Sequence, residues 1–151
     1  MKRNLLLLLA FMFLCPVISE AAKTQENLKI KDVFRIYGKH KNVVMVELSN
    51  EMIDMYDITF YRSITIKNDP EALEFIRKCL EADQKNARKI KEVTDDGGII
   101  SAYYQISEKD SPVNRFILFK VNQKGVITLI YIEGELDSDD LITILFTKKD
   151  L

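Results

Sequence analysis

The sequence predicts an α+β domain: a mixed, mainly antiparallel sheet of about six strands, with helices packed on one face as a two-layer sandwich. Apolar residues recur at helical spacing in several segments, and other runs are rich in β-branched and aromatic residues. Turn sequences join the last strands into hairpins, which makes those strands antiparallel. Helices between the early strands allow crossover connections, and a helix layer on one face of the sheet is the simplest way to bury both apolar surfaces.

Four segments have helical patterns: 30–37, 51–56, 70–83 and a last segment that begins at Ser138. Gly38 offers a natural stop for the first helix. Asn68-Asp69-Pro70 supplies a polar cap and a first-turn proline for the third. Ser138 is expected to cap the last helix, in which Asp139 and Asp140 complement the helix dipole.

Six segments are predicted to be strands: 42–48, 59–67, 89–94, 99–107, 115–121 and 126–133. Asp95-Asp96-Gly97-Gly98 is a strong hairpin turn between the third and fourth strands. A polar loop containing Pro112 follows the fourth strand, and Asn122-Gln123-Lys124-Gly125 turns the chain into the sixth. The second half of the chain is therefore expected to be a meander.

The fifth and sixth strands are apolar on both faces, whereas a strand with one exposed face should alternate apolar and polar residues. Either helices cover both faces of these strands, or one apolar face is presented to a partner. Under the second interpretation the candidate interaction surface consists of Phe116, Leu118, Ile127, Leu129 and Tyr131.

The amino terminus has the pattern of a removable export signal. Lys2 and Arg3 precede a short apolar run that Pro16 interrupts, and the run is shorter than the roughly 20 residues that span a membrane. Ser19-Glu20-Ala21 places small residues at the positions that a signal peptidase requires, so cleavage is expected near Ala21. An uncleaved membrane anchor is the alternative interpretation.

The predicted organisation is a signal peptide over 1–21, a flexible leader over 22–27 and a single domain over 28–151 without a transmembrane span. Cys15 raises the alternative of a lipid anchor. Lipoprotein signals normally have a small residue directly before the cysteine, whereas Leu14 precedes Cys15 here.

Charge and motif content exclude several classes of function. The 151-residue chain has a formal charge of −1, which becomes −2 without residues 1–21 because these hold two cations and one anion. This near-neutral balance supplies no basic surface for nucleic acid or acidic lipid, and neither is an expected partner. No glycine-rich phosphate loop or nucleophile-elbow motif occurs in the sequence, and no cofactor or metal is expected.

The residues with catalytic or metal-binding chemistry have structural explanations. His40 lies between two lysines, which disfavour its protonation and repel a metal, so it is expected to be a solvated residue beside a helix end. Cys79 lies on the apolar stripe of a helix, which favours core packing, although spacing leaves a Cys–His pair open. The acidic residues in 133–140 could hold Ca²⁺, but they lack the order of an EF-hand loop and suit a helix start.

Residues from about Leu28 to Phe146 resemble a family of small exported proteins of Bacteroidetes-type bacteria, recorded only as a domain of unknown function. Three segments carry the resemblance: the 43–49 strand leading to Met52, the 89–94 strand before the 95–98 turn, and the 130–136 run into an acidic helix start. The resemblance implies a secreted, periplasmic or cell-envelope location in a double-membraned bacterium, and it supplies no catalytic residues.

We interpret the chain as an exported envelope protein that is not an enzyme: a non-catalytic binding or structural module whose partner is another envelope protein. The alternative is a periplasmic carrier or sensor of a small apolar ligand, in which Met45, Met52, Met55 and Phe60 line an adaptable pocket. Core packing explains the same four residues. An enzyme would need a mechanism based on carboxylates or on Cys79, and the sequence does not determine the oligomeric state.

Overall fold

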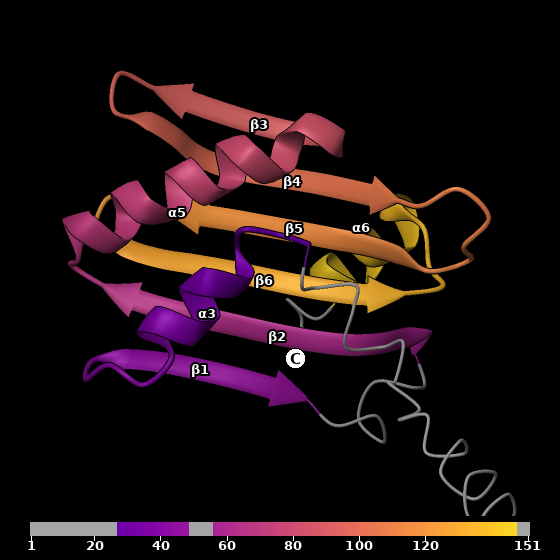
Figure 1. Cartoon of the computed structure of the whole chain (residues 1–151), viewed down its shortest axis with the longest axis horizontal. Coiled ribbons are helices and arrows are strands. Elements are labelled where there is room, and N and C mark those ends of the chain that lie inside the picture. Colours follow the sequence, from indigo (N-terminus) through magenta and orange to yellow (C-terminus); the bar gives the residue numbers. More distant parts are fainter. Residues whose placement is uncertain (1–26, 49–55, 148–151) are drawn as a thin grey trace, which may run out of the picture.

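The computed structural model describes residues 27–48 and 56–147. Within these ranges the chain forms one six-stranded sheet in the order β1-β2-β6-β5-β4-β3, and all neighbouring strands are antiparallel (Figure 1). The α+β class and the six strands are thus confirmed. The elements are α3 (Lys31–Tyr37), β1 (Val43–Leu48), β2 (Ile58–Lys67), α5 (Pro70–Asp83), the short 3₁₀ helix η3 (Gln84–Asn86), β3 (Arg88–Asp95), β4 (Gly98–Ser107), β5 (Asn114–Val121), β6 (Val126–Gly134) and α6 (Ser138–Thr147).

The sequence allowed a mixed sheet, whereas the observed sheet is antiparallel throughout. Helix α5 follows β2 and takes the chain across the sheet to the far edge, where β3 begins (Figure 1). The hairpins β3-β4-β5-β6 then return toward β2, and β6 pairs with it antiparallel from Ile58 to Lys67. A helical crossover between distant strands therefore does not make any neighbouring pair parallel here.

Helix α5 forms where the sequence predicts it because both its start and its buried face are encoded locally. The Asp69 side chain accepts a hydrogen bond from the Ala72 N–H at 2.9 Å, and Pro70 occupies the first turn. Ile76 and Leu80, one turn apart, are fully buried against the sheet. Burial of each such side chain contributes about 1.5–3 kcal/mol to the free energy of folding.

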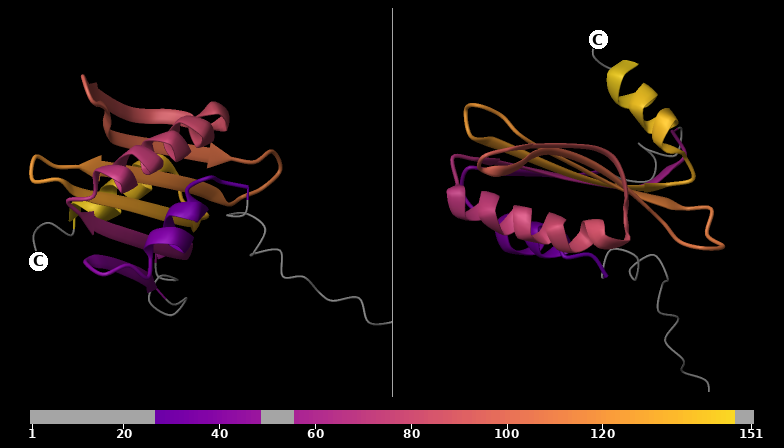
Figure 2. Two further views of the ribbon diagram at one scale, coloured as in Figure 1. Left: turned by 60° about the vertical axis from the view of Figure 1, so that its left-hand side comes forward. Right: turned by 90° about the horizontal axis from the view of Figure 1, so that it is seen from above.

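The main core lies between the sheet and the layer formed by α3 and α5 (Figure 2, right). Each helix contributes one apolar face, and the strands contribute alternate residues because successive strand side chains point to opposite faces. Its largest fully buried members are Tyr104, Tyr131, Ile30, Ile64, Ile66, Ile76, Leu80, Ile117, Ile127 and Leu129.

The last helix departs from the prediction that the helices pack on one face. α3 and α5 cover one face of the sheet, while α6 lies on the opposite side (Figure 2, right). Leu136 and Leu141 are buried there with Ile58, Phe116 and Ile132 in a second apolar cluster. The reason is that β5 and β6 carry apolar side chains on both faces, and a helix layer on one side cannot cover the other.

The chain enters α6 through a tight crossing at Gly134, the last residue of β6. The Glu135 N–H donates a hydrogen bond to the Asp57 carbonyl oxygen at 2.9 Å. A Cβ at Gly134 would overlap that carbonyl oxygen and the Leu136 side chain, and would lie 3.0 Å from the Ile58 Cα. Glycine at this position therefore allows β6 and the start of β2 to approach each other closely.

Several sequence predictions fall wholly or mostly outside the described residues: the signal peptide, Cys15, the 22–27 leader and the short helix over 51–56. Among the residues that the structure does describe, no helix is long and apolar enough to cross a membrane.

Substitution of Gly134 by alanine is expected to lower the free energy of unfolding by about 1–3 kcal/mol, because the new methyl group overlaps backbone that cannot easily move. Gly97→Ala is the matched control, since a Cβ there would meet only side-chain atoms, at 3.3 Å and beyond, in an exposed turn. Urea unfolding of both variants measures the difference. Equal stability of the two would contradict the close approach at Gly134.

Candidate functional site

The five residues predicted to form an interaction surface do not share one face of the sheet. Phe116 belongs to the apolar cluster under α6, and Leu118 packs partly buried against the same cluster. Ile127, Leu129 and Tyr131 belong to the main core under α3 and α5. Four of the five are buried, and only Leu118 is half-buried. Helices thus cover most of both apolar faces, which was the other interpretation of these strands.

A part of the sheet on the α6 side is less covered than the rest. One cross-strand row begins at Val44 on β1 and ends at Val93 on β3, and the residues between them come from β2, β6, β5 and β4: Thr65, Thr128, Lys120 and Ser101. The two valines at the ends of the row are exposed. Most of the row consists of short or polar side chains, so it offers little apolar surface except at its ends.

Exposed apolar side chains concentrate on the edge strand β1. Val44, Met45 and Val46 are 59%, 42% and 41% exposed, and they follow one another along the strand. β1 pairs with β2 over Val43–Leu48 without a register shift, so the edge is regular. An edge strand of this kind presents unpaired backbone N–H and C=O groups next to apolar side chains, which is what strand addition by another chain requires.

The opposite edge strand, β3, has the features that block such pairing. Its register with β4 shifts twice, between Lys89 and Lys91 and between Val93 and Thr94. Charged side chains occupy much of the strand, and the Lys89 ammonium lies 3.1 Å from a Glu92 carboxylate oxygen. Bulges and charges at an edge disfavour addition of a further strand. The two edges of this sheet are therefore chemically different.

The β1 edge has a charge at each end. Lys39 and Lys41 are exposed just before the strand, and Glu47 lies near its end. Arg62 on the neighbouring strand contacts only one oxygen of Glu47, Oε2, with its Nη2 at 2.7 Å. Since the Glu47 side chain is 51% exposed, its other oxygen remains available for a second cation.

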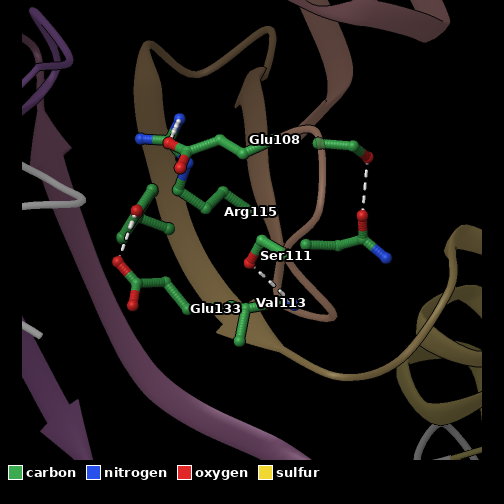
Figure 3. Close-up of polar contacts among 8 residues, drawn as sticks. Glu108, Ser111, Val113, Arg115 and Glu133 are labelled. Atoms are coloured by element: carbon green, nitrogen blue, oxygen red, sulfur yellow. Dashed lines mark hydrogen bonds and ion pairs between the residues drawn. The ribbon is translucent and has the colours of Figure 1, made fainter.

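A partly buried polar cluster lies at the base of the β4–β5 loop (Figure 3). Arg115 on β5 is opposite Glu133 on β6, and both are buried. The Arg115 guanidinium contacts Glu108 Oε1 at 2.7 Å, and the Tyr131 hydroxyl donates to Glu133 Oε1 at 2.6 Å. Burial and the neighbouring Glu133 carboxylate raise the pKa of Tyr131, so this hydroxyl stays protonated. The cluster is internally paired, and its geometry anchors the loop.

Asp83, the last residue of α5, binds the backbone of the segment that precedes α3. Its two carboxylate oxygens accept hydrogen bonds from the Lys29 N–H at 2.7 Å and the Ile30 N–H at 2.9 Å. Burial raises the pKa of the Asp83 carboxyl, and the two N–H donors oppose that shift. This aspartate holds the segment that leads into α3 and was not singled out in the sequence.

His40 and Cys79 lie in different environments. His40 is exposed after α3, and its ring makes an edge contact with the Tyr37 ring at 5.2 Å between centroids. Cys79 is a buried free thiol in the main core, and burial raises its pKa to about 11. A cysteine nucleophile needs an accessible, acidified thiol, and the environment of Cys79 has the opposite effect.

The acidic residues of 133–140 lead into the start of α6, as predicted, but the capping residue differs from the predicted one. Asp137, rather than Ser138, is the capping residue: its Oδ1 accepts hydrogen bonds from the Asp139 N–H at 2.8 Å and the Asp140 N–H at 2.9 Å. Ser138 is buried, and its carbonyl oxygen accepts a hydrogen bond from the Tyr103 hydroxyl. Within 27–48 and 56–147, no three His, Cys, Asp or Glu side chains gather as a metal site would require.

The structure describes two of the four residues proposed to line an apolar-ligand pocket, Met45 and Phe60, and these two lie in different environments. Met45 lies exposed on β1, Phe60 packs against Tyr131 in the main core, and Met52 and Met55 fall outside the described residues. A hollow of about 250 Å³ does occur at the start of α5. It is lined by other residues: Asn68, Asp69, Pro70, Leu73, Gly125 and Ile127.

Comparison with known proteins places the chain in a family. The model of a family of unknown function (DUF6108) matches residues 17–145, which include all six strands. The chain belongs to DUF6108. No curated protein and no solved structure matches it. The DUF6108 match therefore assigns no catalytic or ligand-binding residue to this chain.

Sequence reasoning did not identify the exposed edge of this DUF6108 protein. The apolar run 43–46 is typical of a buried strand, and no local signal distinguishes a central strand from an edge strand. For β3 such a signal was present, because five of the eight residues in 88–95 are charged, which is typical of a protected edge. The buried Arg115 and Glu133 were also detectable, as charged residues next to apolar runs of their strands.

Asp83→Ala is expected to lower the free energy of unfolding by about 2 kcal/mol or more, because two N–H donors lose their acceptor. The matched control is Asp32→Ala on α3, which removes a surface ion pair with Arg35 and should cost less than about 1 kcal/mol. Thermal and urea unfolding provide the comparison. A smaller loss for Asp83→Ala than for Asp32→Ala would show that the anchor contributes little.

Cys79 is expected to resist thiol reagents at pH 8 in the folded protein, with a rate at least about 100-fold below that of the unfolded chain, because its thiolate is rare and buried. The measurement uses a chain that begins at Ala22, so that Cys79 is the only cysteine, with and without denaturant. Cys79→Ser provides the blank. Rapid labelling of the folded chain would contradict the core position.

Proposed function

We propose that this protein is an exported, non-catalytic binding module of the bacterial cell envelope, and that it contacts another protein through the edge strand β1. The observation that carries the proposal is the run of exposed apolar side chains, Val44 to Val46, on a regular edge strand. Strand addition uses the backbone groups of such an edge for affinity and its side chains for specificity.

The other features of the chain support binding rather than chemistry. The thiol of Cys79 is buried with a raised pKa, and the carboxylates of Asp83 and Asp137 accept backbone hydrogen bonds. The guanidinium of Arg115 contacts Glu108 within the protein. These groups have structural roles in the described chain. The export signal in 1–21 and cleavage near Ala21 supply the location in this proposal.

Recovery of a partner from the host's envelope is expected to depend on the β1 edge. The full-length chain with a carboxyl-terminal tag is produced in its host and recovered from the envelope fraction, as wild type and as V44K/V46K. A lysine at an edge position disfavours strand addition, so the double variant should retain about tenfold less of any specific partner.

The control is Val93→Lys, which introduces one lysine at the protected edge β3, in the cross-strand row of Val44. This variant should retain the partner as the wild type does. Equal retention by V44K/V46K and wild type, or no specific protein bound by either, would count against a binding role for β1. Recovery of the protein only from the cytoplasm would contradict the envelope location.

A further inference from the structure

We propose that the partner at the β1 edge is a second copy of this chain, which pairs β1 with β1 antiparallel about a twofold axis. The inference rests on the proposed function, because it uses the same edge. It would join two six-stranded sheets into one sheet of twice that number of strands. Twofold dimers are the commonest form of oligomer, and they use one self-complementary patch on each copy.

Symmetry restricts how two such edges can meet. A twofold axis between antiparallel strands must stand perpendicular to the sheet, so one residue lies opposite its own copy and each face continues across the junction. The layer of α3 and α5 then lies on one side in both copies, and α6 lies on the other (Figure 2). β1 is the outermost strand on its side of the described sheet, next to β2 (Figure 1).

The side chains of β1 are self-complementary when the axis passes at Met45. Val44 of one copy then lies opposite Val46 of the second copy, and the same contact repeats on the other side of the axis. Both valines face the α6 side, since each pairs on β2 with a residue of that face, Thr65 and Ser63. Directly opposed β-branched residues stabilise an antiparallel pair. Among the large apolar residues of the described surface, Val44 has the highest exposed fraction and Val46 the third highest.

The charges at the ends of β1 select the antiparallel orientation. Lys39 and Lys41 precede the strand and Glu47 lies near its end, so antiparallel pairing brings the basic end of one copy to the acidic end of the second. Parallel pairing would place like charges together. The lysines make no ion pair within the described chain, and one oxygen of Glu47 is not used by Arg62. Complementary charges of this kind fix register and orientation more than affinity.

The size of the junction predicts weak association. Pairing centred on Met45 overlaps only Val43 to Glu47. We expect so short a strand pair to bury less than the roughly 1,200 Å² of surface that stable complexes need. We therefore expect a dimer that forms reversibly as concentration rises, rather than a permanent one.

Sedimentation equilibrium of the exported protein over a concentration series tests the proposal. The wild type should pass from monomer to dimer below about 1 mM, a range set by the small overlap. V44K/V46K places lysines opposite lysines and should raise the dissociation constant at least about tenfold, while Val93→Lys should leave it unchanged. Circular dichroism checks that each variant is folded. A wild type that stays monomeric, or a dimer insensitive to V44K/V46K, would overturn the proposal.

Disulfide trapping tests the axis directly. Opposed residues in an antiparallel pair have Cα atoms about 4.5–5.5 Å apart, which a disulfide can bridge. Met45→Cys should therefore form a covalent dimer with oxidised glutathione, whereas Val93→Cys should not. Cys79 is buried, so it is not expected to cross-link in either variant. Equal cross-linking of the two variants would also overturn the proposal.

The two hypotheses fail in different ways. If the wild type is monomeric but V44K/V46K still loses a protein from the envelope fraction, the edge binds a different partner and only the dimer is wrong. If neither sedimentation nor partner recovery responds to V44K/V46K, the β1 edge has no binding role and both proposals fail.

Discussion

The pairing of β6 with β2 holds the two halves of this fold together. β2 belongs to the first half of the chain and β6 ends the meander of the second, and they pair along their length from Ile58 to Lys67. Alternate residues of these strands supply both apolar clusters: Ile64 and Leu129 on the side of α5, Ile58 and Ile132 on the side of α6. Both cores, and the position of β1 at the edge, depend on this one junction.

Local patterns predicted the elements well and their arrangement less well. Helix α5 carries its own cap and apolar stripe, so the sequence predicted a helix over residues 70–83. It also predicted the two strands that flank the 95–98 turn. The sequence did not predict the side of the sheet on which α6 packs. That side depends on the path after Gly134 and on the apolar cluster near Phe116, and both are set by strands distant in sequence. Periodicity shows that a face is buried, but it does not show what buries it.

The candidate site illustrates the same limit. The apolar residues of β5 and β6 suggested a surface, yet they are central strands and helices cover most of both their faces. The apolar run of β1 was predicted to be a strand without a place in the sheet, and it lies at an edge. The composition of the two segments is similar, and only the order of strands in the sheet distinguishes them. That order results from long-range pairing, which a single sequence does not reveal.

The unlike edges of the sheet have a consequence for how far assembly can proceed. A sheet with two receptive edges can add copies at both ends without limit, which is the geometry of a fibril. In this protein the register shifts and charges of β3 close one end. If a chain joins another through β1, one edge of the described sheet is occupied and the other is protected. Growth stops at that point, so the exposed apolar strand does not lead to polymerisation.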